Sequence, residues 1–306
     1  MGRAEKLVVL LEDEGIRWKE TVSNMEREIE ELVGNVFLSA ACISYFGAFT
    51  GFYREKLVSK WLESAKSKSI PVSEKFDIIT IMGDPVVIRG WNIASLPTDQ
   101  VSIENAILAT QAQRWPLMID PEEQGKKWIR NIGKADGLLE LRFTTPNFLR
   151  TLGGAVSIGK PVLVEDLGET VDPGIDPILL KQVFKSGSGI KQIRLGDSNL
   201  DYDDNFKFYM TTKLPNPHYL PEVCIKVTLI NFSVTFRGLQ DQLLGDVVIQ
   251  EKPEVEKKRD EVVVTMDKDQ RTLKQIEITI LKLLSESQIE EILDEDYLIN
   301  ILEDSK

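Results

Sequence analysis

A loop that follows the apolar run ending at Ile119 has the spacing of a phosphate-binding loop but not its chemistry. A working loop reads G-x-x-x-x-G-K-[ST] between a strand and a helix. Gly125 and Lys126 fit that pattern, but Asp120 stands where the first glycine belongs and Lys127 stands where a Ser or Thr would bind Mg²⁺. The spacing predicts a nucleotide-binding fold, and the residues predict a site that does not use ATP.

The acids near this loop reinforce that interpretation. Glu122 and Glu123 put negative charge where phosphates would sit. A working site also needs a second strand that ends in an Mg²⁺-binding Asp, followed by an acid that activates water. The apolar run 161–164 ends in Glu165 and Asp166, the reverse order. Either acid could hold a metal-bound water, or both could be solvated acids at a strand end, and the altered loop favours the second reading.

Three further polar residues occupy positions that matter in such sites. Thr211 and Thr212 end a later apolar run, where a sensor residue is expected. Lys226 stands where a module that completes a neighbour's site would present an arginine. Lysine lacks the planar fork of arginine, so a structural or interface charge is the favoured role for Lys226.

Composition limits the class of protein. The 306 residues are 28% charged and 42% hydrophobic, which fits one large soluble domain or two smaller ones. The net charge of −12 disfavours binding to nucleic acid or to an anionic membrane. Cys42 and Cys224 are far apart in apolar surroundings and predict free thiols in a reducing compartment. A single histidine, His218, excludes a His-rich metal site and makes a Ser-His-Asp triad improbable.

The start of the chain and one uncharged stretch bear on targeting. Arg3, Glu5 and Lys6 precede only a short apolar run, so we expect no signal peptide. A helical pattern already under way at Leu7 indicates a sequence cut from a longer protein. Residues 32–53 carry no charge and are long enough to span a bilayer, but glycines and polar residues dilute them. We therefore expect a buried helix of a soluble assembly and no membrane span.

Heptad patterns occur near both ends of the chain. Residues 5–37 predict a coiled-coil arm, and an ordinary amphipathic core helix is the alternative. Its seam is Trp18, Val22, Met25, Ile29, Leu32 and Val36. The last part predicts helices at 233–248, 254–284 and 288–302. The seam of the long middle helix is broken by Arg259 and Asp269, which is typical of a short, marginal or adjustable coiled coil.

The middle of the chain alternates strand and helix patterns, which predicts a parallel sheet with helices on its faces. We expect a helix over 54–69, closed by Pro71, and then a connecting segment. Predicted strands are 117–119, 139–143, 161–165, 191–195 and 206–211, and predicted helices are 102–111, 126–132, 146–158 and 177–184.

Four strings of the sequence resemble the dynein heavy chain family. They are FKFYMTTKLPNPHYLPE at 206–222, KVTLINF at 226–232, LVGNVFLSA at 32–40 and RWPLMIDP at 114–121. The resemblance extends over about residues 5–250, and the wording around residues 215–219 is similar to axonemal members. It implies an AAA+ P-loop NTPase-like α/β fold, flanked by an N-terminal coiled-coil helix and a C-terminal helical subdomain with long helices.

The resemblance also implies an order of parts. Residues 1–69 would hold the base of the returning stalk helix and entry helices, and 70–95 a connecting segment. Residues 96–222 would be the large subdomain of the fifth AAA+ module, and 223–306 its small subdomain and buttress helices.

The implied function is mechanical. That module is generally non-catalytic in the family, so Asp120, Gly125, Lys126, Lys127, Glu165, Asp166 and Thr211 would form a vestigial nucleotide site. ATP and Mg²⁺ would act elsewhere in the parent motor. The implied direct partners are neighbouring AAA+ modules and the stalk. Microtubules and the light and intermediate chains would be bound through other parts of the parent chain. The implied location is the cytoplasm, the cytoskeleton and the ciliary axoneme. The alternative is a P-loop module that still binds ATP or ADP, with Lys126 on the phosphates, and a membrane-anchored scaffold is a third class.

Overall fold

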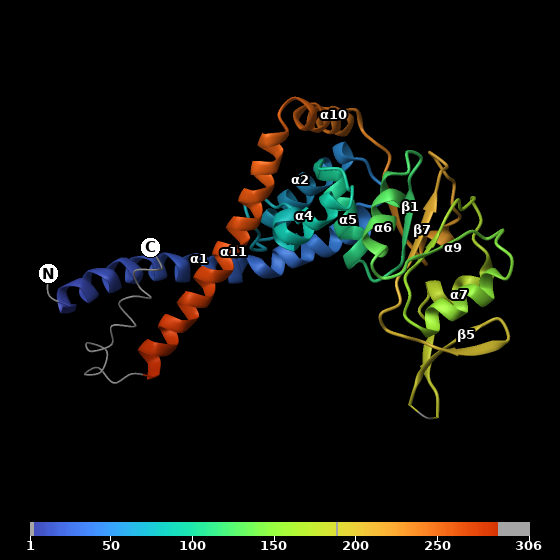
Figure 1. Ribbon diagram of the computed structural model, residues 1–306, viewed down its shortest axis with the longest axis horizontal. Coiled ribbons are helices and arrows are strands. Elements are labelled where there is room, and N and C mark those ends of the chain that lie inside the picture. Colours follow the sequence, from blue (N-terminus) through green and yellow to red (C-terminus); the bar gives the residue numbers. More distant parts are fainter. Residues whose placement is uncertain (1–2, 188, 287–306) are drawn as a thin grey trace. The chain divides into compact units, whose positions relative to one another are not determined.

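Figure 1 shows a computed structural model of the chain, which describes residues 3–187 and 189–286. The chain divides into two compact units. We call residues 35–70 and 74–247 the α/β unit, and residues 1–34, 71–73 and 248–306 the helical unit. The predicted domain boundaries remain a prediction, since compactness alone does not test them.

Two long helices supply the helical unit. Helix α1 runs over Arg3–Tyr45, longer than predicted, and its last residues belong to the α/β unit. Its heptad seam from Val22 to Val36 is exposed, with side chains 53–68% accessible. Helix α11, Pro253–Glu286, begins at the proline as expected for a first helical position. The predicted helix 288–302 and the side chain of Arg259 lie outside the described residues.

Helices α2 to α5 carry the chain from α1 to the sheet. The expected connection at 70–95 contains two short helices, because Asp77 and Asp84 cap them by accepting hydrogen bonds from amide groups two or three residues later. The helices are α2 Gly51–Ser67, α3 Ile78–Met82, α4 Pro85–Ile93 and α5 Gln100–Gln111.

A buried arginine joins these helices within the α/β unit. The Arg54 guanidinium on α2 donates hydrogen bonds to Glu104 at 2.8 Å and to Asn105 at 2.6 Å, both on α5. It also donates to the carbonyl of Phe49 and lies 5.5 Å from the Phe46 ring centre. Asn105 in turn donates to the backbone carbonyl at the end of a sheet strand, so the arginine fixes the helices against the sheet.

A five-stranded parallel sheet forms the centre of the α/β unit, with strand order β2-β3-β7-β1-β8. The inner strands are buried on both faces, which explains their continuous apolar runs. Four predicted strands are confirmed, and β8 is an addition. The strands are β1 Pro116–Ile119, β2 Leu139–Leu141, β3 Val162–Val164, β7 Phe208–Thr212 and β8 Thr228–Asn231, with the short helix α9 Pro221–Cys224 before β8.

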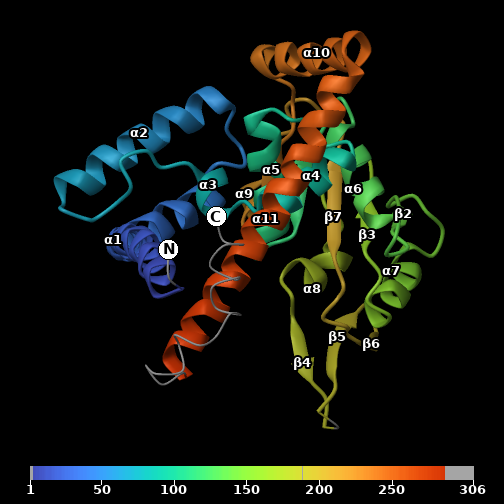
Figure 2. The ribbon, with the colours of Figure 1, turned by 60° about the vertical axis from the view of Figure 1, so that its left-hand side comes forward.

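Helices cover both faces of this sheet, as predicted (Figures 1 and 2). Helix α7, Phe148–Ser157, packs Leu152 and Val156 into a core with apolar side chains of β1, β3 and β7. Helix α6, Gln124–Gly133, begins after β1 and buries Trp128 and Ile129 completely. Helix α10, Phe236–Glu251, follows β8.

Two expectations for residues 177–195 are wrong. The predicted helix 177–184 ends early, because α8 covers only Asp176–Leu179 after a 3-10 turn, η1, at Pro173–Ile175. The predicted strand 191–195 exists but lies in a second, antiparallel sheet of order β4-β5-β6. Its alternating burial, with only Ile193 and Leu195 buried, suits a half-exposed sheet and not a central strand. These strands are β4 Val183–Lys185, β5 Lys191–Leu195 and β6 Ser198–Asp201.

Candidate functional site

The loop between β1 and α6 is closed by the carboxylate of Asp120. One oxygen accepts the amide of Gln124 at 2.8 Å and the other accepts the amide of Lys126 at 2.8 Å. In a working loop, amide groups at this helix end hold phosphate. Burial raises the pKa of Asp120, and hydrogen bonds from the amides of residues 124–126 oppose that rise. Asp120 therefore takes up the amide groups that would hold phosphate in a working loop.

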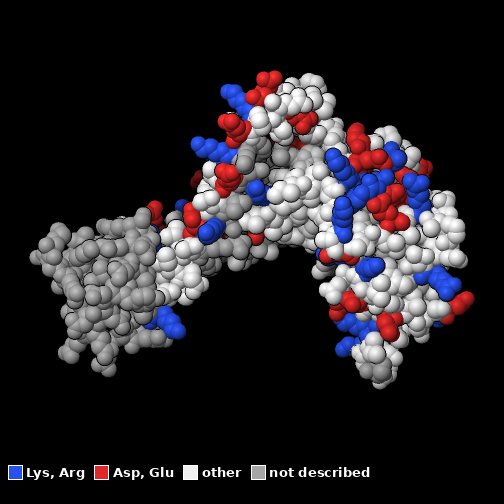
Figure 3. Space-filling view, viewed as in Figure 1, with Lys and Arg blue, Asp and Glu red and all other residues white. Residues whose placement is uncertain are grey.

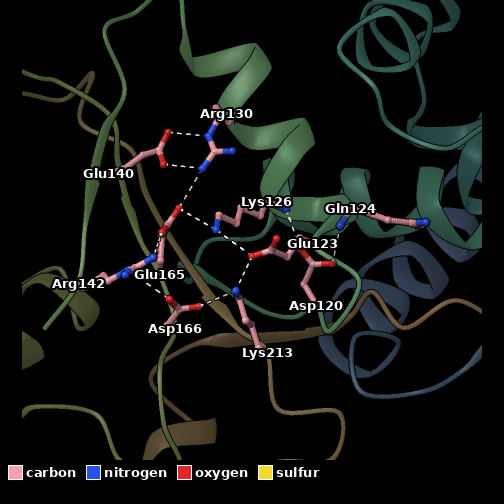
Figure 4. Close-up of polar contacts among 10 residues, drawn as sticks. All are labelled: Asp120, Glu123, Gln124, Lys126, Arg130, Glu140, Arg142, Glu165, Asp166 and Lys213. Atoms are coloured by element: carbon pink, nitrogen blue, oxygen red, sulfur yellow. Dashed lines mark hydrogen bonds and ion pairs between the residues drawn. The ribbon is translucent and has the colours of Figure 1, made fainter. Parts of the chain in front are cut away.

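Lys126, the candidate phosphate lysine, is already paired with two carboxylates of the protein (Figure 4). Its Nζ lies 2.9 Å from Glu123 and 3.2 Å from Glu165, and its side chain is 10% exposed. Burial would lower the pKa of Lys126, but the hydrogen bonds to Glu123 and Glu165 raise it overall. Lys127 and Glu122, by contrast, are exposed. The lysine is held charged by protein carboxylates and needs no phosphate to neutralise it.

An ion-pair network extends from this lysine. Glu165, only 6% exposed, also contacts Arg130 at 3.2 Å and Arg142 at 3.4 Å. Asp166 lies 3.2 Å from Arg142 and 3.7 Å from Lys213. Lys213 reaches back to Glu123 at 2.8 Å, and Arg130 forms a two-point contact with Glu140. In the described part of the chain, four cations thus meet four carboxylates, so the network balances its own charge.

Exposure separates the members of this network. Arg130, Arg142 and Lys213 are 46–56% exposed, so their pairs are screened and each contributes little stability. The buried pair of Lys126 with Glu165 is costly to break from one side, because the remaining charge would stay buried. Glu123 adopts a left-handed backbone with φ 57°, and its hydrogen bonds to Lys213 and Lys126 lower its pKa to about 2.

The two candidate sensor residues connect neighbouring segments. Thr212 donates its hydroxyl to the carbonyl of Leu167 at 2.7 Å, and the backbone carbonyl of Thr211 accepts the Leu167 amide at 3.0 Å. The carbonyl of Thr212 accepts the amide of Asp120 at 2.9 Å. Lys226 is ion-paired to Asp176 at 2.7 Å, which fits a structural charge.

The space beside the start of α6 is closed. Gln242 on α10 donates to Asp99, the residue that caps the start of α5, at 3.2 Å, and Gln124 on α6 donates to Gln242 at 2.9 Å. The cavity these residues line, together with Ser102 and Thr235, has a volume of about 10 Å³. That volume holds about one water molecule. A cavity of this size, beside a loop whose amides and lysine are held by protein carboxylates, does not fit a nucleotide.

The structure places Asp120, Gly125 and Lys126 in the loop between β1 and α6, and Glu165 and Asp166 lie against it through the ion pairs of Lys126 and Lys213. The missed members are Arg130, Glu140, Arg142, Lys213 and Gln242, which come from separate elements and form no local motif. Within residues 3–187 and 189–286, no group of His, Cys, Asp or Glu is arranged to hold a metal ion. In the same residues, no helix is both long and apolar enough for a membrane crossing.

The strand order and the loop after β1 define a class: an AAA+ type α/β module whose phosphate loop is filled by its own side chains. Comparison with known families agrees. Residues 89–306 match the family described as the ATP-binding dynein motor region, and residues 1–64 match the microtubule-binding stalk of dynein motor. The chain belongs to the dynein heavy chain family.

Similar curated proteins are axonemal dynein heavy chains. The chain is 54% identical over 304 residues to dynein axonemal heavy chain 6 of Homo sapiens. It is 45% identical over 304 residues to heavy chain 3 of Mus musculus and 43% identical over 306 residues to heavy chain 1 of Mus musculus. These matches cover 99–100% of this chain but only 7% of each relative.

Proposed function

We propose that this chain is a non-catalytic, mechanical AAA+ module of a dynein microtubule motor. The observation that carries the proposal is the Asp120 carboxylate on the α6 amides, with Lys126 paired to Glu123 and Glu165. A bound nucleotide would have to displace Asp120 and break the buried pair before its phosphates met a free donor. The module would use no cofactor, and ATP and Mg²⁺ would act in other modules of the parent motor.

The mechanical role follows from what the module carries. In this proposal, ATP-driven changes in neighbouring modules move the α/β unit as a block, and the buttress helices, which include α11, pass the movement to the stalk. Such coupling requires a two-state element that both sites bias. A seam interrupted by the exposed polar Asp269 suits an adjustable contact more than a permanent one.

The relatives suggest where the parent motor works. Because they are named axonemal heavy chains, we propose the ciliary or flagellar axoneme as the location. Neighbouring AAA+ modules and the stalk would be direct partners. Microtubules and the light and intermediate chains would be reached through other parts of the parent chain.

Calorimetry with Mg-ATP and Mg-ADP tests the non-catalytic role. We expect no binding heat at millimolar nucleotide for the wild type, Lys126→Ala and Lys127→Ala. The two lysines are adjacent on α6, but only Lys126 points into the loop network, so they form a matched pair. Binding by the wild type that survives in Lys127→Ala and disappears in Lys126→Ala would refute the proposal and establish a regulatory nucleotide site.

The mechanical role needs the parent motor. Replacing Asp269 with leucine should extend the apolar seam of α11, stiffen the buttress and weaken the coupling of ATP turnover to microtubule affinity. Lys268→Leu adds a leucine at the neighbouring exposed position, off the seam, and is the control. Unchanged coupling in Asp269→Leu, or an equal effect of both variants, would count against the proposal.

A further inference from the structure

The edge of the small antiparallel sheet is open to another strand. Strand β4 pairs only with β5 in this sheet, and Figure 2 shows the β4–β5 hairpin extending from the body of the α/β unit. The amide of Ser186 donates to Ile190, so the next pair inward, Lys185 with Lys191, is a pair without mutual hydrogen bonds. The amide and carbonyl of Lys185 therefore point away from β5, where an added strand would meet them.

The charge of this hairpin opposes that of the chain. Residues 177–196 contain four basic residues and no acidic residue, in a chain with net charge −12. Figure 3 shows basic and acidic side chains largely interspersed over the face it presents. Lys191 is neutralised by Asp204 at 2.6 Å, but no carboxylate in the described ranges lies within ion-pair distance of Lys181 or Lys185. These two lysines leave a local positive charge beside the open edge.

Two surface hollows lie beside β4, and Val183 and Phe184 line both. One has a volume of about 460 Å³ and is lined by Trp115, Lys181, Lys185, Tyr202 and Phe206, among others. The other, of about 660 Å³, lies against Pro173, Pro177 and Arg194.

Lys181 is held at the first hollow by an aromatic contact. Its Nζ lies 4.1 Å from the centre of the Trp115 ring. Burial lowers the pKa of this lysine, and no carboxylate offsets that effect. A partner carboxylate would supply the missing countercharge, and apolar side chains of the same partner could fill the hollow.

We propose that the β4 edge binds an extended acidic peptide segment of a partner protein by strand addition. The peptide backbone would pair with the amide and carbonyl of Lys185, and its carboxylates would contact Lys181 and Lys185. Apolar side chains between the acids would enter the hollow against Trp115 and Phe206. In this mode main-chain hydrogen bonds give affinity and the pockets give specificity. The proposal goes beyond the mechanical role and does not depend on it.

Fluorescence anisotropy with two labelled peptides tests the charge. The probe is Glu-Val-Glu-Val-Glu-Val-Glu, and the control replaces each Glu with Lys. We expect the full 306-residue chain to bind the acidic probe saturably, more weakly as salt rises, and not to bind the basic control. Lys181→Glu/Lys185→Glu should weaken binding by about tenfold or more. Lys56→Glu/Lys60→Glu, an equal charge change on exposed positions of α2, should leave it unchanged.

A proline variant tests the backbone pairing. Lys185→Pro removes the outward amide, whereas Lys185→Ala removes only the side chain, and proline is tolerated on an edge strand. We expect Lys185→Pro to bind the acidic probe several-fold more weakly than Lys185→Ala. Equal binding by these two variants would refute strand addition. Equal binding of both peptides, or full binding by Lys181→Glu/Lys185→Glu, would refute the site.

Discussion

Replacing Arg54 with methionine tests how far the buried ion pair on α2 and α5 stabilises the α/β unit. The arginine side chain is 2% exposed and its partner Glu104 is 6% exposed. Methionine keeps most of the apolar volume, so the change removes mainly the charge and the hydrogen bonds to Glu104, Asn105 and the Phe49 carbonyl. Burial lowers the pKa of Arg54, and the ion pair with Glu104 opposes that shift.

The expected cost follows from the carboxylate left behind. Removing one partner of a buried pair costs about 3–5 kcal/mol, because the other charge stays buried and unpaired. For a unit of this size, 1 kcal/mol shifts the unfolding temperature by about 2–4 °C, so we expect a loss of about 6–20 °C. Adding Glu104→Gln removes the orphan charge and should recover part of that loss.

Thermal unfolding followed by circular dichroism measures both effects. Lys56→Met, at an exposed position of the same helix, is the control and should change stability by less than about 0.5 kcal/mol. A shift no larger than that of the control for Arg54→Met would refute the reasoning. So would a double variant, Arg54→Met with Glu104→Gln, that is less stable than Arg54→Met alone.

Three further predictions concern packing, thiol reactivity and acid stability. Gly47→Ala should destabilise by about 1–3 kcal/mol, because the new methyl group would lie 1.8 Å from a backbone carbonyl of β8. Gly90→Ala, with open space around it in α4, should stabilise by about 0.5–1 kcal/mol, and the same thermal assay would show the opposite order if this packing is wrong. Cys42 is fully buried and burial raises its pKa to about 12, so a thiol reagent should modify Cys224 first in the native protein; simultaneous modification would contradict this. Glu123 has its pKa lowered to about 2 by its lysine partners, so it stabilises the fold above its ordinary pKa of 4.5, and that contribution is lost as pH falls toward 2. The unfolding temperature of Glu123→Gln should therefore lie below that of the wild type at neutral pH, and a gap that did not close over this acid range would be evidence against the assignment.

Local sequence pattern predicts the elements in which every residue is buried to the same extent. Apolar runs such as Leu117–Ile119 are buried on both faces, so the run of apolar residues is enough to predict the strand. Strand β8 was missed because its residues alternate in burial and its pairing partner, β1, precedes it by more than 100 residues. The sequence pattern predicts residues 191–195 as a strand of the parallel sheet, but β5 pairs with β4 and β6. Strand pairing of this kind is decided by tertiary contacts, which local sequence does not reveal.

In the candidate site, too, some residues follow from a local motif and others do not. A motif fixes the spacing of Asp120 and Lys126, so sequence alone located the loop and its altered residues. What the motif could not show is that Asp120 fills the anion position itself, since this depends on a backbone turn at Glu123. Arg142 follows β2 and Lys213 follows β7, so both reach the loop from other parts of the sheet. No sequence periodicity links either residue to the loop.

The self-neutralised network around Lys126 also has a consequence for how this sequence can change over time. Replacing Asp120 with glycine alone would free the amide groups of Gln124 and Lys126 but leave Lys126 paired with Glu123 and Glu165. Removing Glu165 alone would leave the buried Lys126 with Glu123 as its remaining counterion, which lowers stability before any binding is regained. Each of these single substitutions therefore leaves nucleotide binding absent or lowers the stability of the fold. Binding would require several substitutions together. An ion-pair network of this kind therefore makes it difficult for the module to acquire nucleotide binding one substitution at a time.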